Sequence, residues 1–178
     1  NTIIAFMSVY AHKVIGFDGK QITSFLILST VFAMLGSLII GWLVKHKGTV
    51  FSYGLVLWIW LTALTLIVIS PGETLFWAVG PLAGVGMGGV WVTSRAIVVE
   101  LSPPEKIGEF FGIYSLAGKM ASIAGPLLWG SVVWIFQDTQ TLKYRAAVGS
   151  LLLITIATIF LFNTLKKQIQ TSAAQIEQ

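Results

Sequence analysis

The sequence contains no cysteine, and only 10% of its 178 residues are charged. The absence of cysteine excludes a disulfide framework, a thiolate metal site and a cysteine nucleophile. Soluble domains carry about 25% charged residues. A chain with this little charge and 56% hydrophobic residues has too few polar side chains to cover itself in water. With a mean hydropathy of +0.86, it is expected to be an integral membrane protein.

Motifs for catalysis, cofactors and metals are also missing. The sequence has no Ser/His/Asp grouping, no glycine-rich phosphate loop ending in Lys-Ser/Thr, and no His-Glu-x-x-His. His46 has no second histidine or carboxylate beside it at a metal-ligand spacing. We therefore expect no enzyme activity, no cofactor and no metal site. The net charge of +4 comes from basic residues scattered between apolar segments, so no nucleic-acid partner is expected.

Six apolar segments make up most of the chain. They cover about residues 2–15, 22–44, 50–70, 74–99, 109–136 and 142–165. These long, uninterrupted runs predict helices, because barrel strands alternate over roughly ten residues. A span needs about 20 residues, and the first segment, with about 14, is too short. We expect an all-α membrane protein with a six-helix bundle whose chain begins inside its first helix, as a fragment of a longer protein would.

Basic residues in the loops predict the orientation of the chain. One side carries Lys45, Lys47, Arg95, Lys106, Lys166 and Lys167, and the other carries Lys13, Lys20, Lys143 and Arg145. The excess on the first side predicts that this side and the C-terminus face the cytoplasm. We therefore expect a multi-pass protein of the inner cell membrane, with a transmembrane part at 1–167. Residues 168–178 would form a polar cytoplasmic tail that frays or extends the last helix.

Small residues recur every four positions on three segments. The stripes are Ser29, Ala33, Ser37 and Gly41 on the second, Gly80, Gly84 and Gly88 on the fourth, and Ala117, Ala121 and Gly125 on the fifth. Such stripes let helix backbones approach closely, in a bundle without any function as well as in a transporter. The fourth segment also contains Pro81, and Gly125-Pro126 is expected to interrupt the fifth.

Lys119 lies within the apolar stretch 110–136, with no acidic residue near it in the sequence. A charge at bilayer depth is costly, so such a residue usually faces the bundle interior or a water-filled cavity. Lys119 lies about 15 Å along the helix from Glu109, and Ser115 and Ser122 share its face. It is predicted to bind an anionic group, balance a distant carboxylate or exchange a proton. The alternatives are a structural ion pair or a side chain that reaches the interface.

The region from Gly88 to Gly130 carries the pattern of a known family. It reads Gly88-Gly89-Val-Trp-Val-Thr-Ser94-Arg95, then Pro103 or Pro104, Glu109-Phe110-Phe111-Gly112-Ile-Tyr114, Gly118-Lys119 and Gly125-Pro126-Leu127-Leu128-x-Gly130. This pattern resembles the second half of Major Facilitator Superfamily transporters. More narrowly, it is similar to the Unknown Major Facilitator family, which is related to the vacuolar amino-acid effluxer of autophagy. The resemblance extends over essentially the whole chain.

This resemblance implies helices seven to twelve of a twelve-helix fold, built as a 3+3 inverted repeat, with the first helix truncated. Substrate would bind near the midplane, between this half and a missing N-terminal half. The implied activity is secondary active transport of a small solute by alternating access, with amino acids as candidate cargo and the lipid bilayer as surroundings. Protons are a candidate coupling ion, although this chain shows no membrane-embedded carboxylate. A non-transporting scaffold or partner subunit, and a channel, remain open alternatives.

The expected cavity residues are Lys119, Ser115, Ser122 and Trp91, although Trp91 could instead pack or contact lipid. The hydroxyl of Tyr114 could lie in the cavity or at the membrane interface.

A further set is expected to serve as gate or structural residues. Arg95 has two possible roles. Its positive charge is favoured by the helix dipole at the C-terminal end of the fourth helix, or it forms a gating ion pair with Glu100 or Glu109. The negative charge of Glu109 could instead simply be favoured by the helix dipole at the N-terminal end of the fifth helix. Gly125 and Pro126 would supply pliability.

The loop after the second segment departs from the superfamily pattern Gly-x-x-x-Asp-Arg-x-Gly. Gly41 and Gly48 match its glycines, but Lys45 and His46 stand where the acid and the arginine would be. The acid that engages neighbouring helix ends in that pattern is therefore absent here. Gly41 and Gly48 are predicted to supply a tight turn.

Overall fold

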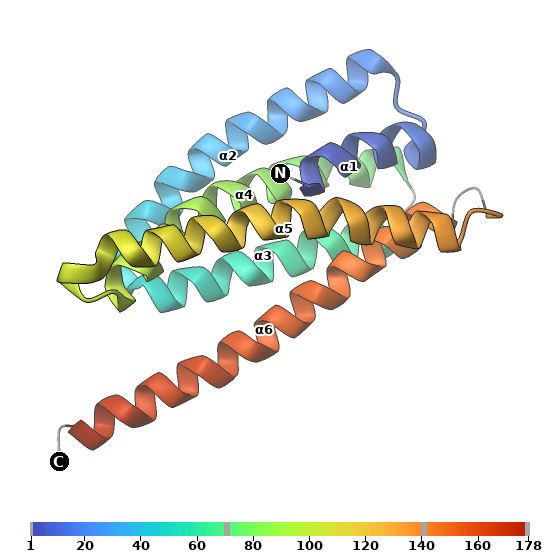
Figure 1. Ribbon diagram of the computed structural model, residues 1–178. Helices are drawn as coiled ribbons and strands as arrows, with labels where there is room; N and C mark the ends of the chain where they lie inside the picture. The colour runs from blue at the N-terminus through green and yellow to red at the C-terminus, as the bar shows by residue number, and fades with distance from the viewer. Residues whose placement is uncertain (1, 70–71, 140–141, 177–178) are drawn as a thin grey trace.

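The computed structural model describes residues 2–69, 72–139 and 142–176, and side chains within these ranges from residue 6 to residue 165. Its elements are α1 (Thr2–Tyr10), the π-helix η1 (Ala11–Ile15), α2 (Gly19–Lys47), α3 (Thr49–Ile69), α4 (Glu73–Leu101), the 3₁₀ helix η2 (Pro104–Lys106), α5 (Ile107–Ile135) and α6 (Leu142–Ile176). In Figure 1, α5 crosses the front of the bundle, while α2 and α6 diverge at opposite edges. The all-α membrane fold is confirmed, and the inverted repeat stays a prediction.

Five helices within the described residues, α2 to α6, are long and apolar enough to cross a membrane. The bounds of α2, α3, α4 and α5 agree with the predicted segments to within one helical turn. The first segment is helical throughout, as α1 and η1, but is not among these five candidate spans. The backbone of α6 continues to Ile176, so most of the tail extends the last helix. Residues 177–178, and the side chains of Lys166 and Lys167, lie outside the description.

Local signals explain where α2 begins and ends. At its start, the Gln21 N–H donates to Asp18 Oδ1 (2.7 Å) and the Asp18 N–H donates to Gln21 Oε1 (2.9 Å), forming a capping box. At its end, Gly48 has φ +86°, which suits glycine and turns the chain into α3. The predicted turn is confirmed at Gly48 and wrong at Gly41, because α2 continues as a helix through Gly41 to Lys47.

The small-residue stripes of α2 and α4 pack against each other. A Cβ atom added at Gly84 would collide with the backbone oxygen of Ser29, and one at Gly88 would collide with that of Ala33. A Cβ at Gly36 would lie 2.6 Å from Val85 Cα. These two helices therefore meet backbone to backbone, as small residues allow in membranes. The expected tight packing of the second and fourth segments is confirmed.

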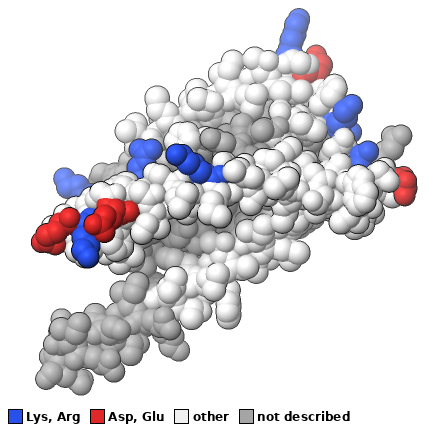
Figure 2. All heavy atoms as spheres, in the orientation of Figure 1, with Lys and Arg blue, Asp and Glu red and all other residues white. Residues whose placement is uncertain are grey.

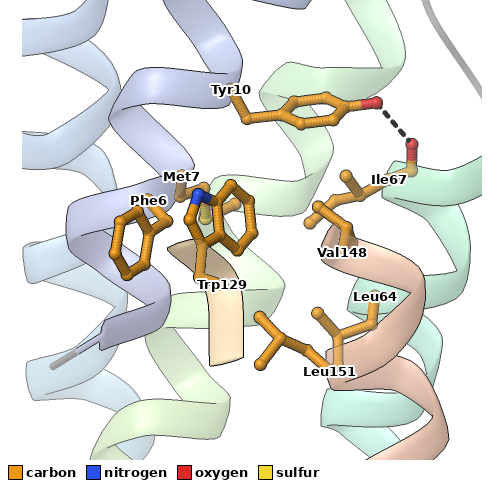
Figure 3. Close-up of a pocket in the computed structure, with 8 residues that line it drawn as sticks. All are labelled: Phe6, Met7, Tyr10, Leu64, Ile67, Trp129, Val148 and Leu151. Carbon is orange, nitrogen blue, oxygen red and sulfur yellow. Dashed lines mark hydrogen bonds between the residues drawn. The ribbon is translucent and has the colours of Figure 1, made fainter. Parts of the chain in front are cut away.

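Part of the hydrophobic core lies where α1 meets α3, α5 and α6 (Figure 3). Its side chains are Phe6, Met7, Tyr10, Leu64, Ile67, Trp129, Val148 and Leu151. Phe6 and Trp129 stack with ring centroids 4.6 Å apart. The empty space among these residues is about 10 Å³, the lower limit for a single water. This region is packed core and offers no room for a substrate.

The end of α3 is tied to two other helices. The Tyr10 hydroxyl donates to the Ile67 carbonyl (3.2 Å), and Arg145 Nη2 donates to the Val68 carbonyl (2.9 Å). Helix ends leave their last carbonyls without intrahelical partners. Side chains from α1 and α6 supply those partners and fix the bundle at this end.

Candidate functional site

The surface of α5 divides into three faces along its length. One packs against the rest of the bundle and includes Ile107, Phe111, Tyr114, Gly125, Leu128 and the buried Trp129. A second is exposed and apolar, and consists of Ile113, Leu116, Met120, Ile123 and Leu127. A third, called here the Lys119 face, is exposed and consists of Gly108, Gly112, Ser115, Lys119, Ser122, Pro126 and Gly130. Steps of three or four residues keep the second set and the third set each on one side of the helix.

The Lys119 face is open over its whole length. A Cβ atom added at Gly108, Gly112 or Gly130 would meet no atom within 4 Å. Lys119 is exposed and makes no ion pair within the described part of the chain. Lys119 therefore lies on the outside of the bundle that this chain forms, and its position in a water-filled cavity stays a prediction. A cavity around Lys119 would need a second wall from outside this chain.

Pro126 adds an acceptor to this face. Because proline has no N–H, the regular helical bond to the carbonyl of Ser122 is missing. The Ser122 hydroxyl donates to the Lys119 carbonyl at 2.7 Å. The Lys119 face thus combines an ammonium group, two hydroxyl oxygens and a carbonyl that lacks its helical donor.

The expected interruption at Gly125-Pro126 is wrong. α5 continues without a break from Ile107 to Ile135, and α4 likewise continues through Pro81. One proline removes one backbone bond, and a membrane helix tolerates that loss when its neighbours hold it. Gly125 is half-buried on the packed face of α5, and Pro126 is exposed.

Trp91 and Arg95 lie apart from α5, in a groove of about 410 Å³ between α2 and α4. Thr30 and Ser37 line the same groove. Trp91 is 50% exposed and also lines a pocket of about 260 Å³ with Thr155 and Thr158 of α6. Neither space is lined by a residue of α5, so Trp91 does not share these pockets with Lys119.

The gating ion pair, one of the two roles left open for Arg95, does not form among the described residues of this structure. Arg95 is exposed, and no ion pair joins it to Glu100 or Glu109 in the described residues. Glu109 is exposed in the first turn of α5, where a negative charge is favoured by the helix dipole. Gly41 is half-buried at the α2–α4 contact, with Val92 Cγ1 3.9 Å from the position of an added Cβ.

Two hydroxyl groups of α2 are not among the site residues that the sequence predicts. Thr30 and Ser37 both line the groove beside Arg95, although the sequence pattern indicates only a packing position for Ser37. Their spacing of two helical turns on α2 was the available signal. The Tyr114 hydroxyl, for which the sequence allows either the cavity or the membrane interface, lies 2.9 Å from the Ser94 hydroxyl, away from the Lys119 face. No group of three or more metal-ligating side chains occurs among the residues described.

The charge distribution suits a membrane-spanning bundle. On the face drawn in Figure 2, acidic side chains lie towards the two ends of the molecule, and most of the basic ones do too, although blue side chains also lie nearer the middle. Charges concentrated at the two ends are the pattern expected of a protein that crosses a bilayer.

Comparison with known proteins gives the family. The family model described as Major Facilitator Superfamily matches residues 1–176. An uncharacterized protein of Aquifex aeolicus is 31% identical over 156 residues, covering 86% of this chain and 40% of the relative. An uncharacterized MFS-type transporter of Bacillus subtilis is 32% identical over 100 residues, covering 56% of this chain and 22% of the relative. Autophagy-related protein 22 of Eremothecium gossypii is 34% identical over 85 residues, covering 48% of this chain and 16% of the relative. No solved structure matches the chain.

These comparisons confirm the resemblance that the sequence motifs indicated. The chain spans less than half the length of the relatives it matches. With five helices able to cross a membrane among its described residues, it is a multi-pass membrane protein.

Proposed function

Because the chain belongs to the Major Facilitator Superfamily, we propose that the whole protein is a secondary active transporter of small solutes and not an enzyme. The Lys119 face of α5 forms part of the wall of its central cavity. The opposing wall comes from an N-terminal half outside this chain, and the two halves alternate access to the two sides of the membrane.

The observation that carries this proposal is the difference between the two exposed faces of α5. Ile113, Met120 and Leu127 on the apolar face are each 64–66% exposed, as lipid-facing residues would be. The Lys119 face has no large apolar side chain. A lysine at the centre of a membrane helix costs about 3 kcal/mol or more when lipid surrounds it. Water in a cavity removes that cost, so the Lys119 face is better suited to a hydrated cavity than to lipid.

The groups on this face fit a small zwitterionic solute. The Lys119 ammonium is a compact charge with three donors, and it can bind a carboxylate. The Ser122 carbonyl, which lacks its helical donor at Pro126, can accept from a substrate ammonium group. Ser115 and Ser122 supply hydroxyl oxygens on either side of Lys119. Amino acids, the substrate class implied by the sequence resemblance, carry both charges. Protons are the candidate coupling ion, with Lys119 as the group on this face that can exchange one.

The remaining predicted site residues act near the cytoplasmic side. Arg95 and Trp91 border the groove between α2 and α4. Since Arg95 has no acidic partner among the described residues of this chain, its gating partner would be a carboxylate on the other half. Gly41 and Gly48 shape α2 and its turn. In this arrangement the protein lies in the inner cell membrane with its C-terminus in the cytoplasm.

Transport by the full-length protein tests this proposal. The protein is reconstituted in liposomes, and counterflow of labelled amino acids is compared for wild type, Lys119→Ala and a control lysine variant, Lys106→Ala, in η2. We expect Lys119→Ala to lose at least about tenfold of its counterflow at an unchanged unfolding temperature, and Lys106→Ala to transport normally.

The alternatives give different results in the same assay. A scaffold or partner subunit predicts that Lys119→Ala lowers stability and leaves uptake of every substrate unchanged. A channel predicts flux without saturable counterflow. Either result would contradict the proposed carrier function.

A further inference from the structure

A separate pocket of about 370 Å³ lies between α3, α4, α5 and α6. It is lined by Val50, Tyr53, Ser94, Ile97, Val98, Glu100, Leu101, Tyr114, Phe162 and Leu165. Tyr114 belongs to the packed face of α5, so this pocket lies on a different side of the helix from Lys119. Its volume falls within the range of small-molecule sites, about 300–1,000 Å³.

The aromatic wall of this pocket is formed by contacts within the bundle. The rings of Tyr53 and Phe162 meet edge to face, with centroids 5.1 Å apart. A Cβ atom added at Gly54 would lie 3.3 Å from Phe162 Cε1, so the glycine leaves room for the Phe162 ring against α3. Phe162 therefore packs α6 against α3, and this contact holds the two aromatic rings that line one side of the pocket.

Two hydroxyl groups form a polar point within the apolar lining. Ser94 Oγ and Tyr114 Oη lie 2.9 Å apart, and either can be the donor. One of the two hydroxyl hydrogens forms this hydrogen bond, and the other remains available as a donor. Neither hydroxyl has a further partner among the described residues. The pair can therefore donate one hydrogen bond to a molecule in the pocket, or accept one from it.

The charge of the pocket is opposite to that of its surroundings. Glu100 is the one charged residue among the described residues that line it, and it makes no ion pair within the described part of the chain. Basic residues nevertheless predominate in the loops on this side of the protein. A carboxylate that lines the same pocket as the rings of Tyr53, Tyr114 and Phe162 favours a cation, because aromatic faces also attract positive charge.

We propose that this pocket binds an amphipathic organic amine in its ammonium form, at a site distinct from the central cavity. The apolar body of the ligand lies among Ile97, Val98 and Phe162. Its ammonium group lies beside Glu100 and the tyrosine rings. This inference does not depend on transport, because it uses none of the residues of the Lys119 face.

Two probes that share the same phenylbutyl group test whether binding requires a positive charge. The full-length protein in zwitterionic lipid nanodiscs is titrated with 4-phenylbutylamine, protonated at pH 7, and with 4-phenylbutan-1-ol, and empty nanodiscs give the background. We expect saturable binding of the amine and at least about tenfold weaker binding of the alcohol. Equal affinities would mean that the pocket takes any apolar chain, including a lipid tail, and would overturn the proposal. So would the absence of saturable amine binding.

Variants locate the site. Glu100→Gln should weaken amine binding about tenfold, whereas Glu105→Gln, an exposed acid of η2 outside the pocket, should not change it. Phe162→Ala should lower the affinity for both probes, because it removes an aromatic ring from the pocket lining. If Lys119→Ala abolished amine binding while Glu100→Gln left it intact, the amine would bind in the central cavity and the inference would be wrong. Should Glu100→Gln not fold, the comparison of the two probes on the wild-type protein decides alone.

Discussion

Glycines have opposite surroundings on α4 and α5. On α4, Gly84 and Gly88 lie against the backbone of α2, and a Cβ atom at either position would collide with a carbonyl oxygen. On α5, Gly108, Gly112 and Gly130 meet nothing within 4 Å. The same residue at the same helical spacing therefore marks a tight helix contact in one place and an open surface in the other.

The difference shows what a small-residue stripe can and cannot indicate. Small residues permit close approach, but they do not ensure that a partner is present within the chain. On α4 the partner is α2. On α5 the open glycines accompany Lys119, Ser115 and Ser122, and large apolar side chains are confined to another face. We interpret the α4 stripe as structural and the Lys119 face as functional, and four experiments can separate the two.

The largest expected effect is at Gly88. Gly88→Leu would force an isobutyl group into the backbone of Ala33, separating α2 from α4, and should cost about 3 kcal/mol or prevent folding. Ala78→Leu is the matched control, because Ala78 is exposed on the same helix. Thermal unfolding of the full-length protein in detergent measures both. If Gly88→Leu were as stable as Ala78→Leu, the close α2–α4 contact would not exist.

A second test compares tryptophans on the two sides of α5. Trp129 is 5% exposed and stacks on Phe6, while Trp134 is 72% exposed. Trp129→Ala should destabilise the protein by about 3 kcal/mol, because it removes the one buried side chain among the described residues of α5. Trp134→Ala should change the free energy of unfolding by less than about 0.5 kcal/mol. Similar losses for both would mean that α5 packs through a different face.

The helices were largely predictable because hydropathy is a local property of the chain. The apolar segments predict the bounds of α2 to α5 to within one helical turn, and Gly48 predicts the turn after α2. The wrong predictions concerned how strongly one residue acts on a long helix. Gly125-Pro126 does not interrupt α5, and Gly41 does not turn α2, because the surrounding helical bonds outweigh a single weak position.

The candidate site was only half predictable, for a different reason. The sequence identified Lys119 and its serine neighbours, since these share a helical face by spacing alone. Whether that face is open depends on which other face of α5 packs against the bundle. The packed face is set by contacts such as that of Trp129 with Phe6, a residue far away in the sequence. The pocket beside Glu100 joins Tyr53, Ser94, Tyr114 and Phe162 from four helices. No local pattern brings such residues together.

Cysteine labelling tests whether the two exposed faces of α5 differ in solvent. The chain has no cysteine of its own, so single cysteines give clean signals once any in the rest of the protein are replaced. Ser115→Cys and Ser122→Cys should react with a hydrophilic maleimide at least about tenfold faster than Met120→Cys and Ile123→Cys, because thiols ionise and react in water. Equal rates on both faces would remove the argument for a hydrated cavity at Lys119.

The smallest expected effect is at Gly112, on the Lys119 face. Gly112→Ala adds a methyl group where nothing lies within 4 Å, so it brings no clash within this chain. Alanine is favoured over glycine inside a helix by about 1 kcal/mol, and the variant should therefore unfold at a slightly higher temperature than wild type. Gly84→Ala, the same change in the α2–α4 contact, should unfold at a lower temperature. A loss of stability at Gly112 as large as that at Gly84 would show that another part of the protein closes on the Lys119 face, and that this face is a packing surface after all.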